Sequence, residues 1–225
     1  MKIVAFLLFM LLSMPIAYAD LYARADKRGE NAPVQVSQDM PTLVKYLTEP
    51  FDTDKAKARA LLSWIVYHID YDNVQYQAYK NKTYKTKTST KRFVKEWNTG
   101  DIFVTRVGMC RDIAELYQRM LLMAGLDAMV VTGDVAQGPH AWTAVKIDGK
   151  WLFVDPTWAT RGNKYVNSSD SSVYTHKQMV KQREKGDKET LKKRSDRSIA
   201  DEWFLVTPQK MKRTHKPDDA RWLNP

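Results

Sequence analysis

The stretch at residues 140–155 constrains the fold most, because it reads as two strands joined by a two-residue turn. Its sequence is "HAWTAVKIDGKWLFVD", and Asp148-Gly149 is a preferred pair for a tight hairpin turn. With these two residues in the turn, Val145 faces Leu152 and one side of the hairpin is apolar. An apolar side of this kind packs on a core, which supports this register. We expect short antiparallel strands at residues 128–133, 140–147 and 151–158.

The other side of this hairpin brings a histidine near an aspartate. In the same register Asp155 lies opposite Trp142, which makes His140 its diagonal neighbour, roughly 7–8 Å away between backbones. A slip of one residue would separate the two side chains, but the apolar pairing argues against it. A carboxylate that accepts a hydrogen bond from one imidazole nitrogen fixes the tautomer of the ring. The other nitrogen is then left to exchange a proton.

The single cysteine of the chain, Cys110, stands where a loop enters a helical pattern. The apolar stripe of this predicted helix is Ile113, Leu116, Tyr117, Met120 and Ala124, with Gly125 as a stop. A lone thiol can be a buried bystander, an intermolecular link or a reactive group. At a helix start, unpaired N–H groups and the helix dipole favour the thiolate. Together with His140 and Asp155, Cys110 has the layout of acyl-transfer catalysis by a thiol.

The remainder of the chain predicts one further helix and an irregular beginning. From Asp54 the apolar residues follow helical spacing as far as Ile69, with Asp52 or Thr53 as the cap. His68 on this stripe is interpreted as a half-buried structural residue. Residues 20–53 are polar and contain Pro33, Pro41 and Pro50, so we expect an irregular lead-in. Helices and antiparallel strands together predict an α+β fold.

The first residues predict an export signal. "MKIVAFLLFMLLSMPIAYAD" has a positive start, a short apolar run and small residues before a cut after Ala19. The apolar run is short for a membrane span, although an uncleaved N-terminal anchor is the alternative. We therefore expect a periplasmic or secreted protein with the signal peptide at residues 1–19. Cysteines of exported proteins usually form disulfides, which makes a single one more notable.

The chain is basic, with a formal net charge of +10. Two stretches without an apolar period, residues 77–92 and 176–200, carry much of this charge and read as insertions or solvated segments. An exported basic protein meets anionic envelope surfaces, and these stretches are candidates for binding to such a surface. Binding to nucleic acid is not expected. The histidines and the cysteine show no metal-ligand spacing, and we expect no metal or other cofactor.

Several segments together resemble the transglutaminase-like superfamily, whose fold is papain-like. "VGMCRDIAELYQRMLLMAGLDAMVVTGDV" is similar to its nucleophile helix and following strand, and "HAWTAVKIDGKWLFVDPTW" to its His and Asp strands. "IDYDNVQY" and the final "EWFLVTPQKMKRTHKPDDARWLNP" resemble the subgroup that includes the cytokinesis protein Cyk3 and kyphoscoliosis peptidase. The resemblance suggests a bacterial exported member. It implies a domain over residues 54–225 with a nucleophile helix packed on an antiparallel sheet.

The resemblance also implies roles for individual residues. Cys110 becomes the nucleophile, His140 the general base and acid, and Asp155 the residue that orients His140. The Cys110 N–H would be one oxyanion donor, and Tyr71 is the candidate for the second. Trp142 and Trp158 are expected to pack around the site. His215, in the THxPxxxxW end motif, is interpreted as structural. Arg111 stands where the subgroup often has glycine.

The expected reaction is cleavage of a peptide or carboxamide bond through a thioester on Cys110. Water as the acceptor makes the protein a peptidase or amidase acting on a protein or peptide substrate, and an amine makes it a cross-linking transamidase. A non-catalytic protein-binding scaffold of the same fold is the rival hypothesis. The substrate and the acceptor are not specified by these motifs.

Overall fold

The structure is a computed structural model that describes residues 21–72, 76, 102–104, 106–162 and 196–225. The predicted signal peptide and most of the two basic stretches lie outside these residues. Within the described part, no helix has the length and apolar character to cross a membrane.

A four-stranded sheet of order β5-β4-β3-β8 forms the centre of the fold. Its strands are β3 (Ala128–Val135), β4 (Gly138–Ile147), β5 (Lys150–Val154) and β8 (Lys216–Pro217). All of its pairings are antiparallel, and β4 pairs with β5 in the predicted register, Val145 opposite Leu152. Asp148 and Gly149 both have positive φ, at 50° and 76°, as the tight turn requires. The hairpin prediction is confirmed.

The last predicted strand is shorter than expected. It was predicted to run to residue 158, but β5 ends at Val154, one residue before Asp155. The Asp155 N–H donates to the Trp203 carbonyl instead of continuing the ladder. Its side-chain Oδ1 accepts hydrogen bonds from the N–H groups of Thr157 and Trp158, which turns the chain away from the sheet.

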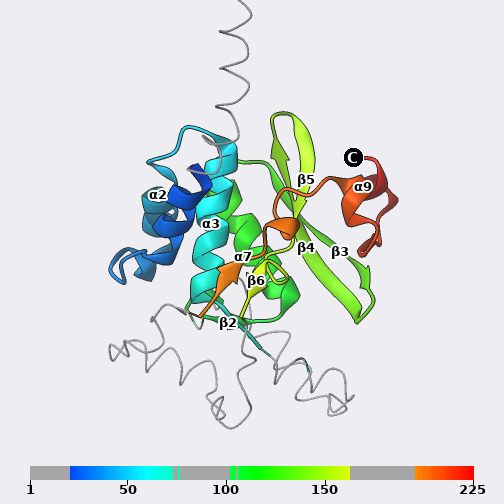
Figure 1. The fold of residues 1–225 in the computed structure, drawn as a ribbon, viewed down its shortest axis with the longest axis horizontal. Helices are drawn as coiled ribbons and strands as arrows, with labels where there is room; N and C mark the ends of the chain where they lie inside the picture. The colour runs from blue at the N-terminus through cyan, green and yellow to red at the C-terminus, as the bar shows by residue number, and fades with distance from the viewer. Residues whose placement is uncertain (1–20, 73–75, 77–101, 105, 163–195) are drawn as a thin grey trace, which may run out of the picture.

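Helix α7 packs on one face of the sheet and α3 packs on α7, and both helices form the main core with the sheet (Figure 1). The first, α3, spans Asp54–His68 and is capped by the Thr53 hydroxyl, which accepts from the Ala56 N–H. The second, α7, spans Cys110–Met123 and crosses β3 and β4. Both agree with the sequence predictions, including the start of α7 at Cys110. The α+β class, with the helix that begins at Cys110 packed on an antiparallel sheet, is therefore confirmed.

The irregular lead-in predicted for residues 20–53 is wrong. Residues 21–30 are helical, and they are followed by the 3-10 turn η1 (Val36–Gln38) and the helix α2 (Met40–Thr48). Pro41 does not break α2 because it lies in the first turn, where its missing N–H has no helical partner to lose. Leu43 and Leu47 of α2 are fully buried in the main core, so this segment belongs to the domain.

The C-terminal segment covers the opposite face of the sheet. It contains η3 (Asp201–Trp203), α9 (Pro208–Met211) and η4 (Ala220–Leu223), and Figure 1 shows α9 across the sheet from α2 and α3. Val206, Met211 and Trp222 of this segment pack on Trp142 and Phe153 in a second apolar cluster. The sheet is therefore buried on both sides, by helices on one and by the C-terminal segment on the other.

Two small pairings complete the described fold. The parallel pair β1 (Asp70–Tyr71) and β2 (Val107–Gly108) leads into α7, and β6 (Thr160–Arg161) pairs with β7 (Ser198–Ile199).

Arg197 corrects the interpretation of the second basic stretch, because it is buried. Its guanidinium donates to the carbonyls of Val66 and Ile69 at 2.9 and 2.6 Å and pairs with the Asp70 carboxylate. The end of the stretch is therefore part of the fold, and Arg197 holds the last turn of α3.

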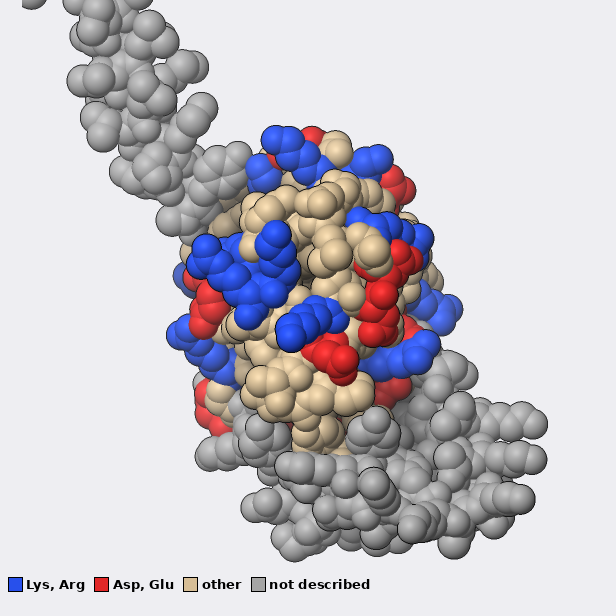
Figure 2. All heavy atoms as spheres, turned by 90° about the vertical axis from the view of Figure 1, so that its right-hand side faces the viewer, with Lys and Arg blue, Asp and Glu red and all other residues tan. Residues whose placement is uncertain are grey.

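The surface of the C-terminal side carries charges of both signs. Figure 2, which faces this side of the molecule, shows Lys and Arg interspersed with Asp and Glu. Lys210, Lys212 and Arg213 are exposed here, and Arg221 pairs with Asp219. Several Lys and Arg residues lie side by side on the left part of this face, and acidic residues lie toward its right (Figure 2).

Candidate active site

Cys110 is half-buried at the first position of α7, and its thiol is free. The preceding Met109 is extended, and its N–H donates to the Asp112 carboxylate at 2.9 Å, which caps the helix start. Gly108 lies in close packing before the cysteine. A Cβ at this position would lie 2.5 Å from the side chain of Ile102 and 3.0 Å from that of Asp112. The loop and the cap together fix the entry of Cys110 into the helix.

Asp112 has an unusually high pKa for a carboxyl group in the first turn of a helix. Burial raises its pKa to about 6, against the opposing effect of the hydrogen bond from the Met109 N–H. The carboxyl nearest to the start of α7 therefore titrates in the mildly acidic range.

His140, at the start of β4, contacts Asp155 directly. Its Nε2 lies 2.7 Å from Asp155 Oδ2, and both residues are buried. With Nε2 on the carboxylate, Nδ1 is the nitrogen left for Cys110, which lies close enough to His140 to contribute to its raised pKa. The structure therefore brings Cys110, His140 and Asp155 together, as the hairpin register and the helix start predicted.

The His140–Asp155 contact changes the proton affinity of both groups. Burial lowers the pKa of His140, but the charge and hydrogen bond of Asp155, with a further contribution from Cys110, outweigh it and raise the pKa to about 10. Burial raises the pKa of Asp155, but the charge of His140 and four hydrogen bonds outweigh it and lower the pKa to about 2. At neutral pH the contact is an imidazolium–carboxylate pair.

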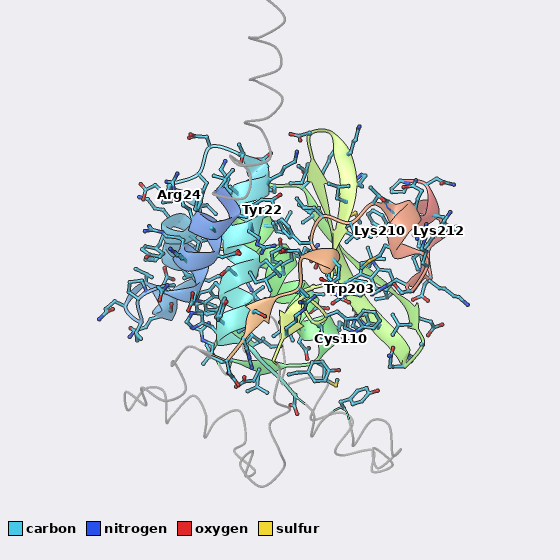
Figure 3. All side chains as sticks on the ribbon, viewed as in Figure 1. Tyr22, Arg24, Cys110, Trp203, Lys210 and Lys212 are labelled. Atoms are coloured by element: carbon cyan, nitrogen blue, oxygen red, sulfur yellow. The ribbon has the colours of Figure 1, made fainter. Side chains whose placement is uncertain are left out.

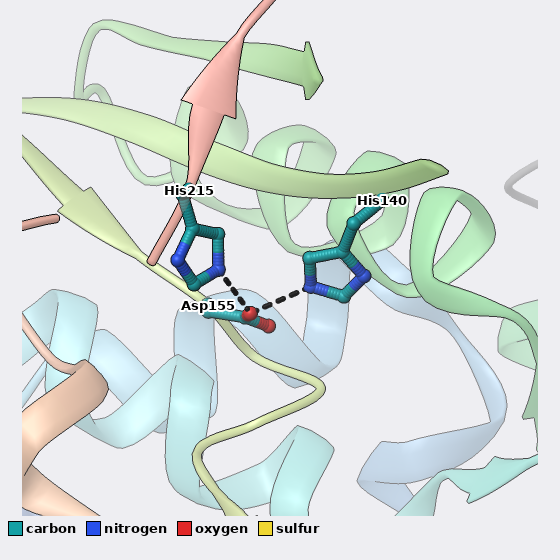
Figure 4. Close-up of side chains that lie close together, drawn as sticks. All are labelled: His140, Asp155 and His215. Atoms are coloured by element: carbon teal, nitrogen blue, oxygen red, sulfur yellow. Dashed lines mark hydrogen bonds and ion pairs between the residues drawn. The ribbon is translucent and has the colours of Figure 1, made fainter. Parts of the chain in front are cut away.

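Sequence reasoning missed the second imidazole at this carboxylate. His215 Nε2 lies 3.1 Å from Asp155 Oδ2, the oxygen that also contacts His140, and Figure 4 shows the two rings converging on it. His215 is fully buried, and its Nδ1 lies 2.8 Å from the Thr214 hydroxyl. The signal in the sequence was the THxPxxxxW end motif, which was given a structural role.

Three tryptophans surround these two histidines and are called here the aromatic cage: Trp142, Trp158 and Trp203. The ring centroids of Trp158 lie 5.4 Å from those of His140 and 4.6 Å from those of His215. Trp142 is fully buried, with its ring 4.8 Å from His215. Trp203 joins from the C-terminal segment and packs on Trp158. The predicted packing positions Trp142 and Trp158 lie where expected, and Trp203 was not foreseen.

Cys110 and His140 open into a cavity of about 850 Å³. Figure 3 shows Cys110 and Trp203 on the same side of the molecule, and both line this cavity. Tyr71 is also on its wall, with its ring centroid 6.0 Å from that of Tyr76. The location suits the predicted oxyanion role of Tyr71, which stays a prediction. Arg111 lines the same cavity, and its guanidinium pairs with Glu115 at 3.0 Å.

His140, Asp155 and His215 offer ligand atoms within 4.8 Å of one another, a grouping that sequence spacing did not indicate. Hydrogen bonds account for this grouping. Asp155 Oδ2 faces both imidazoles, and Oδ1 accepts from the N–H groups of Thr157 and Trp158 at 2.9 and 3.0 Å. A histidine Nε2 that donates to a carboxylate has no lone pair to offer a metal ion. The residues present therefore fit a hydrogen-bonded site rather than a metal centre.

The site thus combines a thiol at the start of α7, an imidazole on β4 and a carboxylate directly after β5. The sequence model of the Transglutaminase-like superfamily matches residues 41–156. The chain belongs to this superfamily.

Curated relatives include the kyphoscoliosis peptidases of human and mouse. The human protein is 25% identical over 201 residues, which cover 84% of this chain and 25% of the relative. The mouse protein is 29% identical over 160 residues, which cover 66% of this chain and 22% of the relative. The chain thus spans about a quarter of the length of these relatives.

Solved structures with a similar fold include a protein described as a TGase, with a TM-score of 0.45 and 22% identity. The match covers 64% of this chain and 35% of that one. The periplasmic domain of TgpA from Pseudomonas aeruginosa has a TM-score of 0.39 and 21% identity, covering 60% and 48% of the two chains.

Proposed function

We propose that this protein is a cysteine-dependent acyl-transfer enzyme that acts on peptide or carboxamide bonds. The observation that carries the proposal is the buried His140–Asp155 pair beside Cys110, with His140 and Cys110 lining the same cavity. An ion pair with a structural role alone would not need a thiol beside its histidine. Family membership supports the same chemistry, since its members include peptidases and transglutaminases.

In the first half of the proposed reaction, the Cys110 thiolate attacks the carbonyl carbon of the substrate. The C–N bond then breaks, and the His140 imidazolium gives its proton to the departing amine. The acyl group remains on Cys110 as a thioester. Asp155 holds His140 through Nε2 and so keeps the other ring nitrogen, Nδ1, directed toward the reacting groups.

In the second half, an acceptor attacks the thioester while His140 takes its proton. Water as the acceptor releases a carboxylic acid, and an amine forms a new amide; both restore the Cys110 thiolate and the imidazolium. We propose hydrolysis as the main reaction, a peptidase or amidase activity, with transamidation as the alternative. The name of the curated relatives, peptidase, favours hydrolysis.

The developing oxyanion needs hydrogen-bond donors, and we propose the Cys110 N–H and the Tyr71 hydroxyl for this role. Tyr71 belongs to β1, which pairs with β2 just before Cys110. Its side chain lines the same cavity as Cys110. Tyr71→Phe is expected to lower turnover roughly 100-fold, the effect of losing one oxyanion donor, with little change in Cys110 alkylation. Unchanged turnover would remove Tyr71 from the mechanism.

Alkylation tests the proposed function without a known substrate. Iodoacetamide should label Cys110 faster than it labels free cysteine at neutral pH, because His140 and the helix start support the thiolate. His140→Ala should slow labelling at least roughly tenfold, and Cys110→Ser gives the background. A scaffold of the same fold predicts a Cys110 that reacts no faster than free cysteine or only after unfolding.

We further propose that the protein is exported and cut after Ala19, a cut supported by the small residues before it. N-terminal sequencing of the natural product should then begin at Asp20, and retention of Met1 would contradict the cut. Binding of the basic stretches to an anionic envelope surface is proposed with it. Such binding should be weakened by salt and should persist in Cys110→Ala.

A further inference from the structure

We propose that His215 is a positioning residue for the reaction, because it fixes the Asp155 oxygen that holds His140. The inference rests on the proposed function. The C-terminal segment therefore contributes a fourth side chain to the catalytic arrangement, rather than only covering the sheet.

The contacts of Asp155 show why a second imidazole matters. Oδ1 is anchored by the backbone, through the N–H groups of Thr157 and Trp158 at 2.9 and 3.0 Å. Oδ2 has imidazole partners, His140 at 2.7 Å and His215 at 3.1 Å. Without His215, Oδ2 would keep only the first of these two imidazole contacts, the one with His140. The carboxylate plane could then turn about its Cβ–Cγ bond. With His215 in place, Oδ2 is held from a second direction while His140 moves during proton transfer.

The surroundings of His215 direct its Nε2 toward Asp155. Its Nδ1 is occupied by the Thr214 hydroxyl at 2.8 Å, so Nε2 is the nitrogen that faces the carboxylate. Trp142, Trp158 and Trp203 lie with ring centroids 4.8, 4.6 and 5.5 Å from the His215 ring. A fully buried ring held between three aromatic groups has little freedom to turn away. A residue needed only for packing could be apolar, but His215 also makes a hydrogen bond to the catalytic carboxylate.

The chain after His215 is fixed against the sheet at close range. Lys216 and Pro217 form β8, which pairs with Gly133 and Asp134 of β3. The fit depends on the absence of a side chain at Gly133, because a Cβ there would lie 2.1 Å from the Lys216 carbonyl oxygen. The position of His215 is therefore set by the same sheet that carries His140.

The test compares two alkylating reagents on Cys110 over a range of pH. Iodoacetate is anionic and is attracted by the His140 imidazolium, whereas iodoacetamide is neutral. The ratio of the two rates should therefore fall as His140 loses its proton, which reports the charge on His140 without any substrate. The variants are His215→Met, which removes the donor while keeping the bulk, and His215→Gln, which keeps a donor near Nε2. Trp222→Phe is the control, because it weakens the packing of the same segment away from Asp155.

In His215→Met the Asp155 carboxylate is free to turn, which weakens its contact with His140, so the fall in the rate ratio should move to lower pH by about one unit. His215→Gln should restore most of the wild-type profile. Trp222→Phe should lower the urea midpoint and leave the profile unchanged. A His215→Met variant with reduced stability but a wild-type profile would overturn the inference, as would a shift to higher pH or a His215→Gln variant no better than His215→Met. If wild-type Cys110 shows no dependence on His140, the proposed function fails and the inference with it.

Discussion

His140 and Asp155 hold opposite charges inside the protein, and each determines the proton affinity of the other. The pKa of His140 is raised to about 10 and that of Asp155 is lowered to about 2, both against the effect of burial. Such a pair is a source of pH-dependent stability as well as of reactivity.

The variant Asp155→Asn tests this linkage through the free energy of unfolding. A raised His140 pKa stabilises the fold fully below 6.5, and this contribution is lost as pH rises through about 10. A lowered Asp155 pKa stabilises the fold above 3.8, and this contribution is lost as pH falls through about 2. The stability difference between wild type and Asp155→Asn should therefore be largest between pH 3.8 and 6.5 and shrink toward pH 10. Urea unfolding across this range measures it, with the exposed Asp127→Asn as the control. A difference independent of pH would contradict the ion pair.

Asp112 predicts the opposite trend. Its pKa is raised by burial to about 6, so ionisation opposes folding and stability falls as pH rises from 3.8 toward 6. Asp112→Asn removes this charge and keeps an oxygen acceptor for the Met109 N–H. The variant should gain stability relative to wild type on going from pH 4 to pH 7, as measured by urea midpoints. An equal difference at both values would show that burial does not control this carboxyl.

The elements of the fold deliver these side chains from separate places. Helix α7 brings Cys110, β4 brings His140, the end of β5 brings Asp155, and the residue before β8 brings His215. The contact between β3 and β8 leaves no room for a side chain, because the Lys216 backbone lies directly over Gly133.

Gly133→Ala is therefore expected to displace β8 and to disturb the site more than its small size suggests. The added methyl group would meet the Lys216 carbonyl oxygen at 2.1 Å, so the backbone has to shift. Cys110 alkylation by iodoacetate should fall several-fold, and the change in its pH profile should resemble that of His215→Met. Wild-type alkylation in a folded Gly133→Ala protein would show that β8 does not position the site.

Sequence patterns predicted the elements whose structure is determined by neighbouring residues in the chain. The Asp148-Gly149 turn fixed the hairpin register through its own backbone preference, and that register placed His140 near Asp155. Helix α7 was visible because its apolar stripe and the Gly125 stop lie within one segment. His215 could not be placed in this way, because it reaches Asp155 across 60 residues of sequence. Arg197 was read as one of many surface cations, since nothing in a charged run marks which member is buried.

At the scale of the whole molecule, buried arginines connect distant segments of the described chain. Arg59 of α3 pairs with Asp26 of the first helical segment at 2.6 Å and with Asp201 of η3 at 2.7 Å. Arg197 links the chain before β7 to the end of α3 and to Asp70. The first and last parts of the described chain are thus fixed to the same central helix.

Arg197→Met should be strongly destabilising, because it removes the buried guanidinium that pairs with the Asp70 carboxylate and donates to two carbonyls at the end of α3. Breaking a buried pair by removing one partner costs roughly 3–5 kcal/mol. Arg197→Lys should recover part of this loss, since it restores the charge but not all of the hydrogen bonds to the Val66 and Ile69 carbonyls. Urea unfolding of the three proteins measures both effects. A loss below about 1 kcal/mol would show that the Arg197–Asp70 pair contributes little to stability.

The central claim, that Cys110 carries an acyl group during turnover, is tested most directly by trapping that group. The full chain would be mixed with peptides from a proteome digest, quenched in acid to preserve thioesters, and analysed by mass spectrometry. We predict an adduct on Cys110 that hydroxylamine removes and that is absent from Cys110→Ala and strongly reduced in His140→Ala. An adduct equally abundant in His140→Ala, or no adduct on the wild-type protein beyond that seen with Cys110→Ala, would contradict the account.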